Sequence, residues 1–135
     1  MITNEDIDTL ARTLYGEARG EPHQGRLLVA YVILNRWRTQ YRGNRTIRDV
    51  CLDPWQFSCW NSNDPNRDKL LEVTLSNKVF RECYMAALEA IDAVNELPLK
   101  TRHYYAKTMP RAPFWAAGHE PVKEYGNHRF YEGVA

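Results

Sequence analysis

The sequence predicts a mainly helical α+β fold with a buried central helix and one small strand element. Apolar residues recur at helical spacing in residues 7–18 and 79–94, which indicates two amphipathic helices. Residues 27–34 are apolar almost without a break, so the helix that contains them is expected to be buried on all sides. Residues 101–106 and 128–131 have the aromatic content typical of strands.

The first two helices can be placed by their N-terminal residues. Thr3 and Asp6 have the spacing of a capping box, in which each side chain binds the backbone N–H of the other residue. Pro22 is expected in the first turn of the central helix, where its missing N–H costs nothing. This helix is expected to run to about Trp37.

Two further helices follow. Thr46 is expected to cap a short helix that must stop before Pro54. Ser76 or Asn77 is expected to cap a long helix that ends near Val94. After it the strand-like segments begin, and several prolines and glycines between them exclude long regular structure.

The composition fits one unit, and we expect residues 1–135 to form a single domain. The formal net charge is +1, so no global field favours nucleic acid, and no apolar run is long enough to insert into a membrane. The polar N-terminus lacks the features of a signal peptide. We therefore expect a protein made in the cytoplasm that reaches its substrate after release, or a chain that has lost its export segment.

Arginines are concentrated in residues 36–48. A solvated surface is the expectation for such a tract. The functional alternative is attraction to an anionic polymer, either nucleic acid or the carboxylates of a bacterial wall.

The chain has three cysteines, Cys51, Cys59 and Cys83, which cannot all pair with one another. An odd number without a signal peptide favours reduced, buried thiols. No Cys-x-x-Cys or His-x-x-x-His spacing is present, so neither a metal site nor a cofactor is expected.

Glu17 is the leading candidate for catalysis. On a helical wheel it falls beside Leu10 and Leu14, at the margin of the buried face. A carboxyl at such a border is partly desolvated, which disfavours its charged form. A carboxylic acid that stays protonated near neutral pH can protonate a glycosidic oxygen. The alternative is a solvated side chain paired with Arg12 or Arg19.

Several sequence blocks carry a resemblance to a known family. They are residues 10–21 with their continuation to 36, residues 55–58 (Trp-Gln-Phe-Ser), residues 103–105 (His-Tyr-Tyr) and residues 126–131 (Gly-Asn-His-Arg-Phe-Tyr). In this order they resemble the SleB-type cell wall hydrolases, which include spore cortex-lytic enzymes and phage-encoded lysins. The resemblance implies a lysozyme-like fold and a lytic transglycosylase that cuts peptidoglycan, with Glu17 as its acid and base.

The resemblance also implies substrate-binding residues. Gln56 and Phe57 match the family's Gln-Phe pair, and Tyr105 matches a tyrosine that Asn follows in the family and Ala106 follows here. Because Gln56 and Tyr105 lie outside the periodic helices, we expect their polar groups to serve the substrate rather than the fold. His128 matches a histidine for which a structural role and a place in the cleft both remain open.

Aromatic and polar residues outside the helices indicate a groove for sugars. Flat rings stack on sugar faces, and hydroxyl and amide groups bind the sugar hydroxyls. Trp55, Ser58 and Tyr104 supply both kinds of group in segments that loops surround, where sites are common. We expect a monomer that binds the glycan strands of peptidoglycan.

The number of carboxylates at the scissile bond distinguishes a hydrolysing glycosidase from a lytic transglycosylase. A hydrolysing glycosidase normally has two carboxylates across the scissile bond. Aspartates at positions 49, 53, 64 and 68 are possible partners of Glu17, whereas Glu21 lies beyond the expected helix end and is interpreted as a residue of the cap region. One acid suffices for a lytic transglycosylase. A hydrolytic muramidase, a non-catalytic wall-binding module and a nucleic-acid binder are the alternatives.

Overall fold

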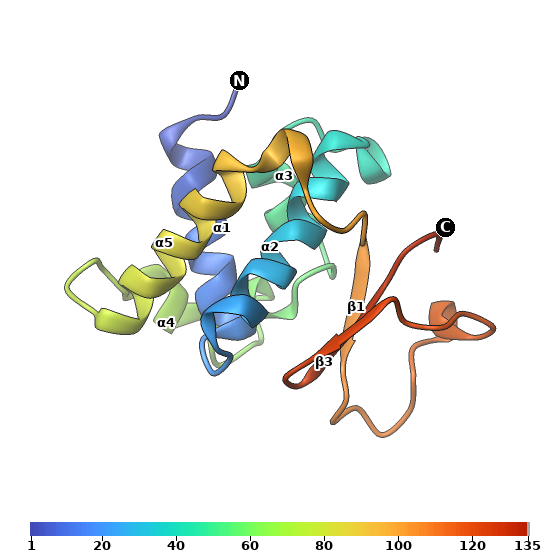
Figure 1. The fold of residues 1–135 in the computed structure, drawn as a ribbon. Coiled ribbons are helices and arrows are strands. Elements are labelled where there is room, and N and C mark those ends of the chain that lie inside the picture. The colour runs from blue at the N-terminus through green and yellow to red at the C-terminus, as the bar shows by residue number, and fades with distance from the viewer. Residues whose placement is uncertain (135) are drawn as a thin grey trace.

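The computed structural model describes residues 1–134, with a helical part and a small sheet at its side (Figure 1). The helices are α1 (Asn4–Ala18), α2 (His23–Arg38), α3 (Ile47–Leu52), α4 (Arg67–Glu72) and α5 (Lys78–Asp92). The strands are β1 (His103–Ala106), β2 (Lys123–Tyr125) and β3 (His128–Tyr131). The mainly helical α+β class that the sequence predicts is confirmed.

The helical part is built around α2. Residues 25–36 of this helix are all buried, and α1 and α5 pack against it and against each other. Leu14 of α1 and Phe80 of α5 are among the fully buried side chains of this core. The predicted central helix is therefore confirmed. None of the helices within residues 1–134 combines the length and apolar character that crossing a membrane requires.

The predicted caps are largely confirmed. Thr3 Oγ1 accepts a hydrogen bond of 3.1 Å from the Asp6 N–H, and Asp6 Oδ2 accepts one of 3.0 Å from the Thr3 N–H. Thr46 caps α3, and Asn77 rather than Ser76 caps α5. Pro22 is the N-cap of α2 and does not lie in its first turn, because its ψ of 168° is extended.

The strands form one antiparallel sheet in the order β1-β3-β2. Tyr104 of β1 lies opposite Phe130 of β3, and Glu124 of β2 lies opposite Arg129. Residues 107–122 connect β1 to β2 as an excursion on the side away from the helices (Figure 1). The middle strand, β3, therefore pairs with both strands that the 107–122 connection links, β1 on one side and β2 on the other.

Two short elements were not predicted. The helix α4 has six residues and buries only Leu70, and β2 has three residues that are mostly exposed. Elements this short show too little periodicity to be recognised in a sequence. They form because segments elsewhere in the chain pack against them. The prediction for the cysteines is confirmed, because Cys51, Cys59 and Cys83 are all buried and unpaired.

Candidate active site

Glu17 lies in the last turn of α1, at the border between the core and a cleft. It is half-buried, whereas Leu14 and Ala18 on the same face are buried. The preceding Gly16 allows a close approach, because a Cβ atom there would lie 2.7 Å from Cys59 Sγ and 2.8 Å from Leu70 Cδ2. The missing side chain at Gly16 thus lets the segment around Cys59 pack directly against the helix end that carries Glu17.

A cleft of about 460 Å³ opens beside Glu17. Its walls come from the ends of α1 and α2, the loop after α3, β1, the 107–122 connection and β3. The structure brings together all of the site residues that the sequence suggested, which are Glu17, Trp55, Gln56, Phe57, Ser58, Tyr104, Tyr105 and His128. Arg36 and Met109 also line the cleft, although no sequence pattern placed them there.

Tyr104 is the direct partner of Glu17. Its hydroxyl donates a hydrogen bond of 2.8 Å to Glu17 Oε1. Burial, reinforced by the negative charge of Glu17, raises the pKa of the Tyr104 hydroxyl well above its usual value. The hydroxyl therefore stays protonated and remains a donor to Oε1. Tyr104 binds Oε1 and not Oε2, and the buried thiol of Cys59 also lies beside the carboxylate, which reinforces the rise that burial causes in the pKa of that thiol.

The neighbouring Tyr105 has packing and hydrogen-bonding partners within the fold. Successive residues of a strand face opposite sides, so Tyr104 meets α1 while Tyr105 packs with Trp115 and Tyr131 in a separate apolar cluster. Its hydroxyl accepts a hydrogen bond of 3.1 Å from Arg129 Nη1. The expectation that the polar group of Tyr105 has no structural partner is wrong, although the ring does line the cleft.

His128 lies where β3 meets the cleft. Its ring packs edge-on against Tyr104, with 5.1 Å between the ring centroids. Its Nδ1 lies 3.0 Å from Glu21 Oε1. Burial lowers the pKa of the imidazole, while the carboxylates of Glu21 and Glu17 oppose that shift. The His128 ring therefore lines the cleft and also packs against Tyr104, the residue that binds Glu17.

Arg36 departs from the surface position expected for the arginine tract. It is 7% exposed, and its guanidinium lies 4.8 Å from the ring centre of Tyr41 and 5.3 Å from that of Phe57. Its position on the buried face of α2 explains the difference. Arg36 Nη1 lies 3.4 Å from Gln56 Oε1. Since arginine only donates, this contact turns the amide oxygen of Gln56 toward Arg36 and leaves its NH2 group for another acceptor.

The loop after α3 presents one side chain outward and one inward. Trp55 is 77% exposed, and its φ of 67° lies in the left-handed region that bulky residues rarely adopt. Ser58 is exposed on the same loop, whereas Phe57 is buried and forms the wall of the cleft from the core side. The flat, accessible ring of Trp55 is therefore available for stacking, and Phe57 contributes shape.

Glu17 is the only carboxylate among the cleft-lining residues of the described chain, 1–134. Asp53 accepts hydrogen bonds of 2.7 Å from Arg42 Nε and 2.9 Å from Asn44 Nδ2. Asp64 accepts a backbone N–H within its own loop. Neither these two aspartates nor those at positions 49 and 68 line the cleft. Within residues 1–134 the cleft thus offers one carboxyl group and no second carboxylate opposite it.

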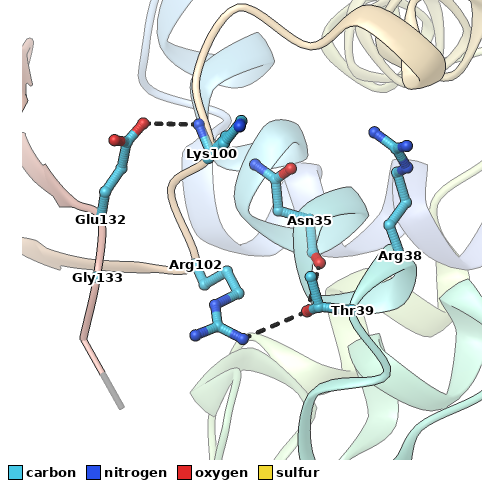
Figure 2. Close-up of a pocket in the computed structure, with 7 residues that line it drawn as sticks. All are labelled: Asn35, Arg38, Thr39, Lys100, Arg102, Glu132 and Gly133. Carbon is cyan, nitrogen blue, oxygen red and sulfur yellow. Dashed lines mark hydrogen bonds between the residues drawn. The ribbon is translucent and has the colours of Figure 1, made fainter.

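A second hollow, of about 470 Å³, lies at the C-terminal end of α2 (Figure 2). None of the predicted site residues lines it. Its polar groups bind one another. Arg102 Nη1 lies 3.4 Å from Thr39 Oγ1, and the Lys100 N–H donates a 2.7 Å hydrogen bond to Glu132 Oε1 (Figure 2). The first contact joins the C-cap residue of α2 to the segment before β1, and the second joins that segment to the residue after β3. The cleft beside Glu17, which holds the predicted site residues, is therefore the candidate active site.

Comparison with known proteins finds close relatives over nearly the whole chain. Residues 20–131 match the family described as Cell Wall Hydrolase. The spore cortex-lytic enzyme of Bacillus subtilis (strain 168) is 30% identical over 133 residues, which are 97% of this chain and 39% of that enzyme. The spore cortex-lytic enzyme of Halalkalibacterium halodurans is 56% identical over 128 residues, 95% of this chain and 35% of that enzyme.

The fold also has solved counterparts. The catalytic domain of the germination-specific lytic transglycosylase SleB from Bacillus anthracis superposes with a TM-score of 0.72 and 29% sequence identity, over 96% of both chains. This match confirms the lysozyme-like fold class expected from the sequence. The described chain thus spans less than half the length of the curated relatives and nearly all of a solved catalytic domain.

Proposed function

The chain belongs to the cell wall hydrolase family, and from this premise we propose that it is a lytic transglycosylase that cuts the glycan strands of peptidoglycan. The observation that carries the proposal is the position of Glu17, the one cleft-lining carboxylate within residues 1–134, with Oε1 bound by the Tyr104 hydroxyl. The resemblance to a catalytic domain described as a lytic transglycosylase supports the same activity.

In the first step Glu17 acts as a general acid. Its Oε2, the oxygen that Tyr104 does not bind, gives a proton to the oxygen between N-acetylmuramic acid and N-acetylglucosamine. The glycosidic bond breaks, and the leaving sugar keeps that proton as its new hydroxyl. The Tyr104 hydroxyl holds the carboxyl group by Oε1 and stabilises the carboxylate that remains.

In the second step the same carboxylate acts as a base. It takes the proton of the C6 hydroxyl of the muramic acid while that oxygen bonds to C1, which closes a 1,6-anhydro ring. No water is consumed, and Glu17 returns to its protonated form. The nucleophile belongs to the substrate and is already held close to C1. This proximity lowers a large part of the barrier that a second catalytic group would otherwise have to lower.

The walls of the cleft suit a glycan strand. We propose that Trp55 stacks on a sugar ring at the rim, and that Gln56 and Ser58 bind polar groups of the sugars. Phe57, Tyr105 and His128 shape the cleft. In this proposal residues 1–135 act on the cell wall as a single catalytic domain and as a monomer, since one chain supplies every residue of the cleft.

The experiment uses purified peptidoglycan. The wild-type protein is expected to clear a suspension, and Glu17→Gln, which is nearly isosteric, is expected to lose about a hundredfold to ten-thousandfold in rate. Its melting temperature should stay close to that of the wild type. Clearing by the folded Glu17→Gln protein at the wild-type rate would overturn the assignment, and an inactive wild-type protein that still binds the wall would make the chain a binding module.

A further inference from the structure

We propose that Glu21 is a positioning residue whose carboxylate fastens the turn between β2 and β3 to the end of α1, and so holds His128 and Tyr104 in place against Glu17. This inference rests on the proposed function, because the acid that it serves is Glu17. It gives Glu21 a different task from the cap-region role that the sequence indicated.

The first argument is the set of contacts at the carboxylate. Glu21 Oε1 accepts a hydrogen bond of 2.9 Å from the Asn127 N–H, across 106 residues of sequence. The same oxygen lies 3.0 Å from His128 Nδ1. The Glu21 side chain is only 12% exposed. A carboxylate that is removed from water and bound to a distant turn fixes the position of that turn relative to α1.

The second argument is the space around Glu21. A Cβ atom at Gly126, whose φ is +55°, would overlap the Glu21 carboxylate. On the other side, a Cβ atom at Gly25 of α2 would lie 2.9 Å from Glu21 Cβ. Two glycines therefore enclose Glu21, Gly25 from α2 and Gly126 from the turn between β2 and β3. The backbone of this turn contacts the Glu21 carboxylate directly.

The third argument is the route from Glu21 to the acid. His128 follows the turn that Glu21 holds, and its ring packs edge-on against Tyr104. The Tyr104 hydroxyl in turn donates its 2.8 Å hydrogen bond to Glu17. Glu21 itself does not line the cleft, so it acts on Glu17 only through these residues. Glu17 lies in the last turn of α1 and Glu21 in the connection from α1 to α2, and each carboxylate binds one residue of the sheet or of its turn.

The test compares two substitutions at this position. Glu21→Gln keeps an oxygen that accepts the Asn127 N–H, and Glu21→Ala removes it. With soluble glycan fragments as substrate, we expect Glu21→Ala to lower kcat by about tenfold or more while KM changes by less than about twofold, because a small misplacement of a catalytic group acts on the chemical step. Glu21→Gln should keep kcat within about threefold of the wild type, which a requirement for the carboxylate as a second catalytic base would not allow.

A double-mutant cycle tests the packing directly. Gly126→Ala should lower kcat in the wild-type protein, because the new methyl group displaces the Glu21 carboxylate. In the Glu21→Ala background the same substitution should cost less, since the space has been vacated. Gly118→Ala is the matched control, because Gly118 also has a positive φ but no neighbouring atom within 4 Å. Its effect measures backbone strain alone.

The outcomes separate this inference from the proposed function. A folded Glu21→Ala protein with wild-type kcat, or one that loses only stability, would overturn the positioning role, and so would an equal loss of kcat in Glu21→Gln. If Glu21→Ala does not fold, Gly126→Ala measured against Gly118→Ala decides by the same kcat readout. Full activity of Glu17→Gln would overturn the proposed function whatever Glu21 does.

Discussion

The hydroxyl of Tyr104 and the Oε1 atom of Glu17 are joined by a 2.8 Å hydrogen bond that spans 87 residues of sequence. The bond connects β1 to the end of α1. The geometry of the proposed acid therefore depends on how the small sheet docks onto the helices, and substitutions in the sheet should separate catalysis from stability.

Tyr104→Phe removes this bond and little else. We expect a loss of about tenfold or more in kcat, since hydrogen bonds to charged groups are worth about 1.5–3 kcal/mol. The melting temperature should change little. Tyr105→Phe is the matched control one residue along the strand. It loses the bond from Arg129, so it should lower the free energy of unfolding, and it should lower kcat less than Tyr104→Phe does because the hydrogen bond to Glu17 stays intact. The opposite order of effects would show that Tyr105 is the tyrosine that serves the reaction.

Trp55→Gly should weaken substrate binding without lowering the stability of the fold. Glycine adopts a φ of +67° without steric cost, which relieves a strain of about 1–3 kcal/mol, but the substitution removes the exposed ring. We expect KM for glycan fragments to rise several-fold while the free energy of unfolding does not fall. Trp55→Ala should raise KM equally without relief of the strain. Unchanged KM values in both variants would remove Trp55 from the substrate site.

Gly16→Ala and Gly20→Ala form a pair with opposite expectations. A methyl group at Gly16 would meet Cys59 and Leu70 at 2.7–2.8 Å, whereas one at Gly20 would meet no atom within 4 Å. Overpacking of this kind costs about 1–3 kcal/mol, so Gly16→Ala should be less stable and less active. Gly20→Ala should be neutral or slightly stabilising. Urea unfolding measures both, and equal stabilities would show that the contact at Gly16 relaxes freely.

His103 should make the stability depend on pH. Burial, reinforced by the positive charges of Arg36 and Arg102, lowers the pKa of His103 to about 4. A histidine in the unfolded chain has a pKa of about 6.5, so between these values the unfolded state binds more protons. The stability that the neutral imidazole of His103 contributes is complete above about pH 6.5 and is lost as the pH falls toward about 4.

The check on His103 is urea unfolding at about pH 7 and about pH 4.5. We expect the wild type to lose more stability between the two than His103→Gln, which keeps a polar group for Tyr41 but does not titrate. Parallel losses in the two proteins would show that other groups account for the acid sensitivity.

Much of the helical part could be predicted because its signals are local. The Thr3 and Asp6 pair, the cap at Asn77 and the apolar run of α2 depend on residues a few positions apart. Glu17 could be placed at a border of the core for the same reason. The segment 128–131 was recognised as a strand from its composition, and its bounds agree with β3.

The features that could not be predicted depend on contacts between distant segments. Whether Tyr104 or Tyr105 faces Glu17 follows from the register of β1 against β3, which composition does not fix. Arg36 belongs to an arginine-rich tract by sequence, yet the rotation of α2 buries it. The task of Glu21 depends on Asn127, which a local pattern around residue 21 does not reveal.

The most direct test of the account is the mass of the products that the wild-type protein releases from purified peptidoglycan. With Glu17 as the one cleft-lining carboxylate within residues 1–134, the C6 hydroxyl of the substrate is the available nucleophile. The account predicts products that end in 1,6-anhydro-muramic acid and are lighter by one water than hydrolysis products. Reducing-end muramic acid as the main product would contradict it and would mean that the protein activates water as a muramidase.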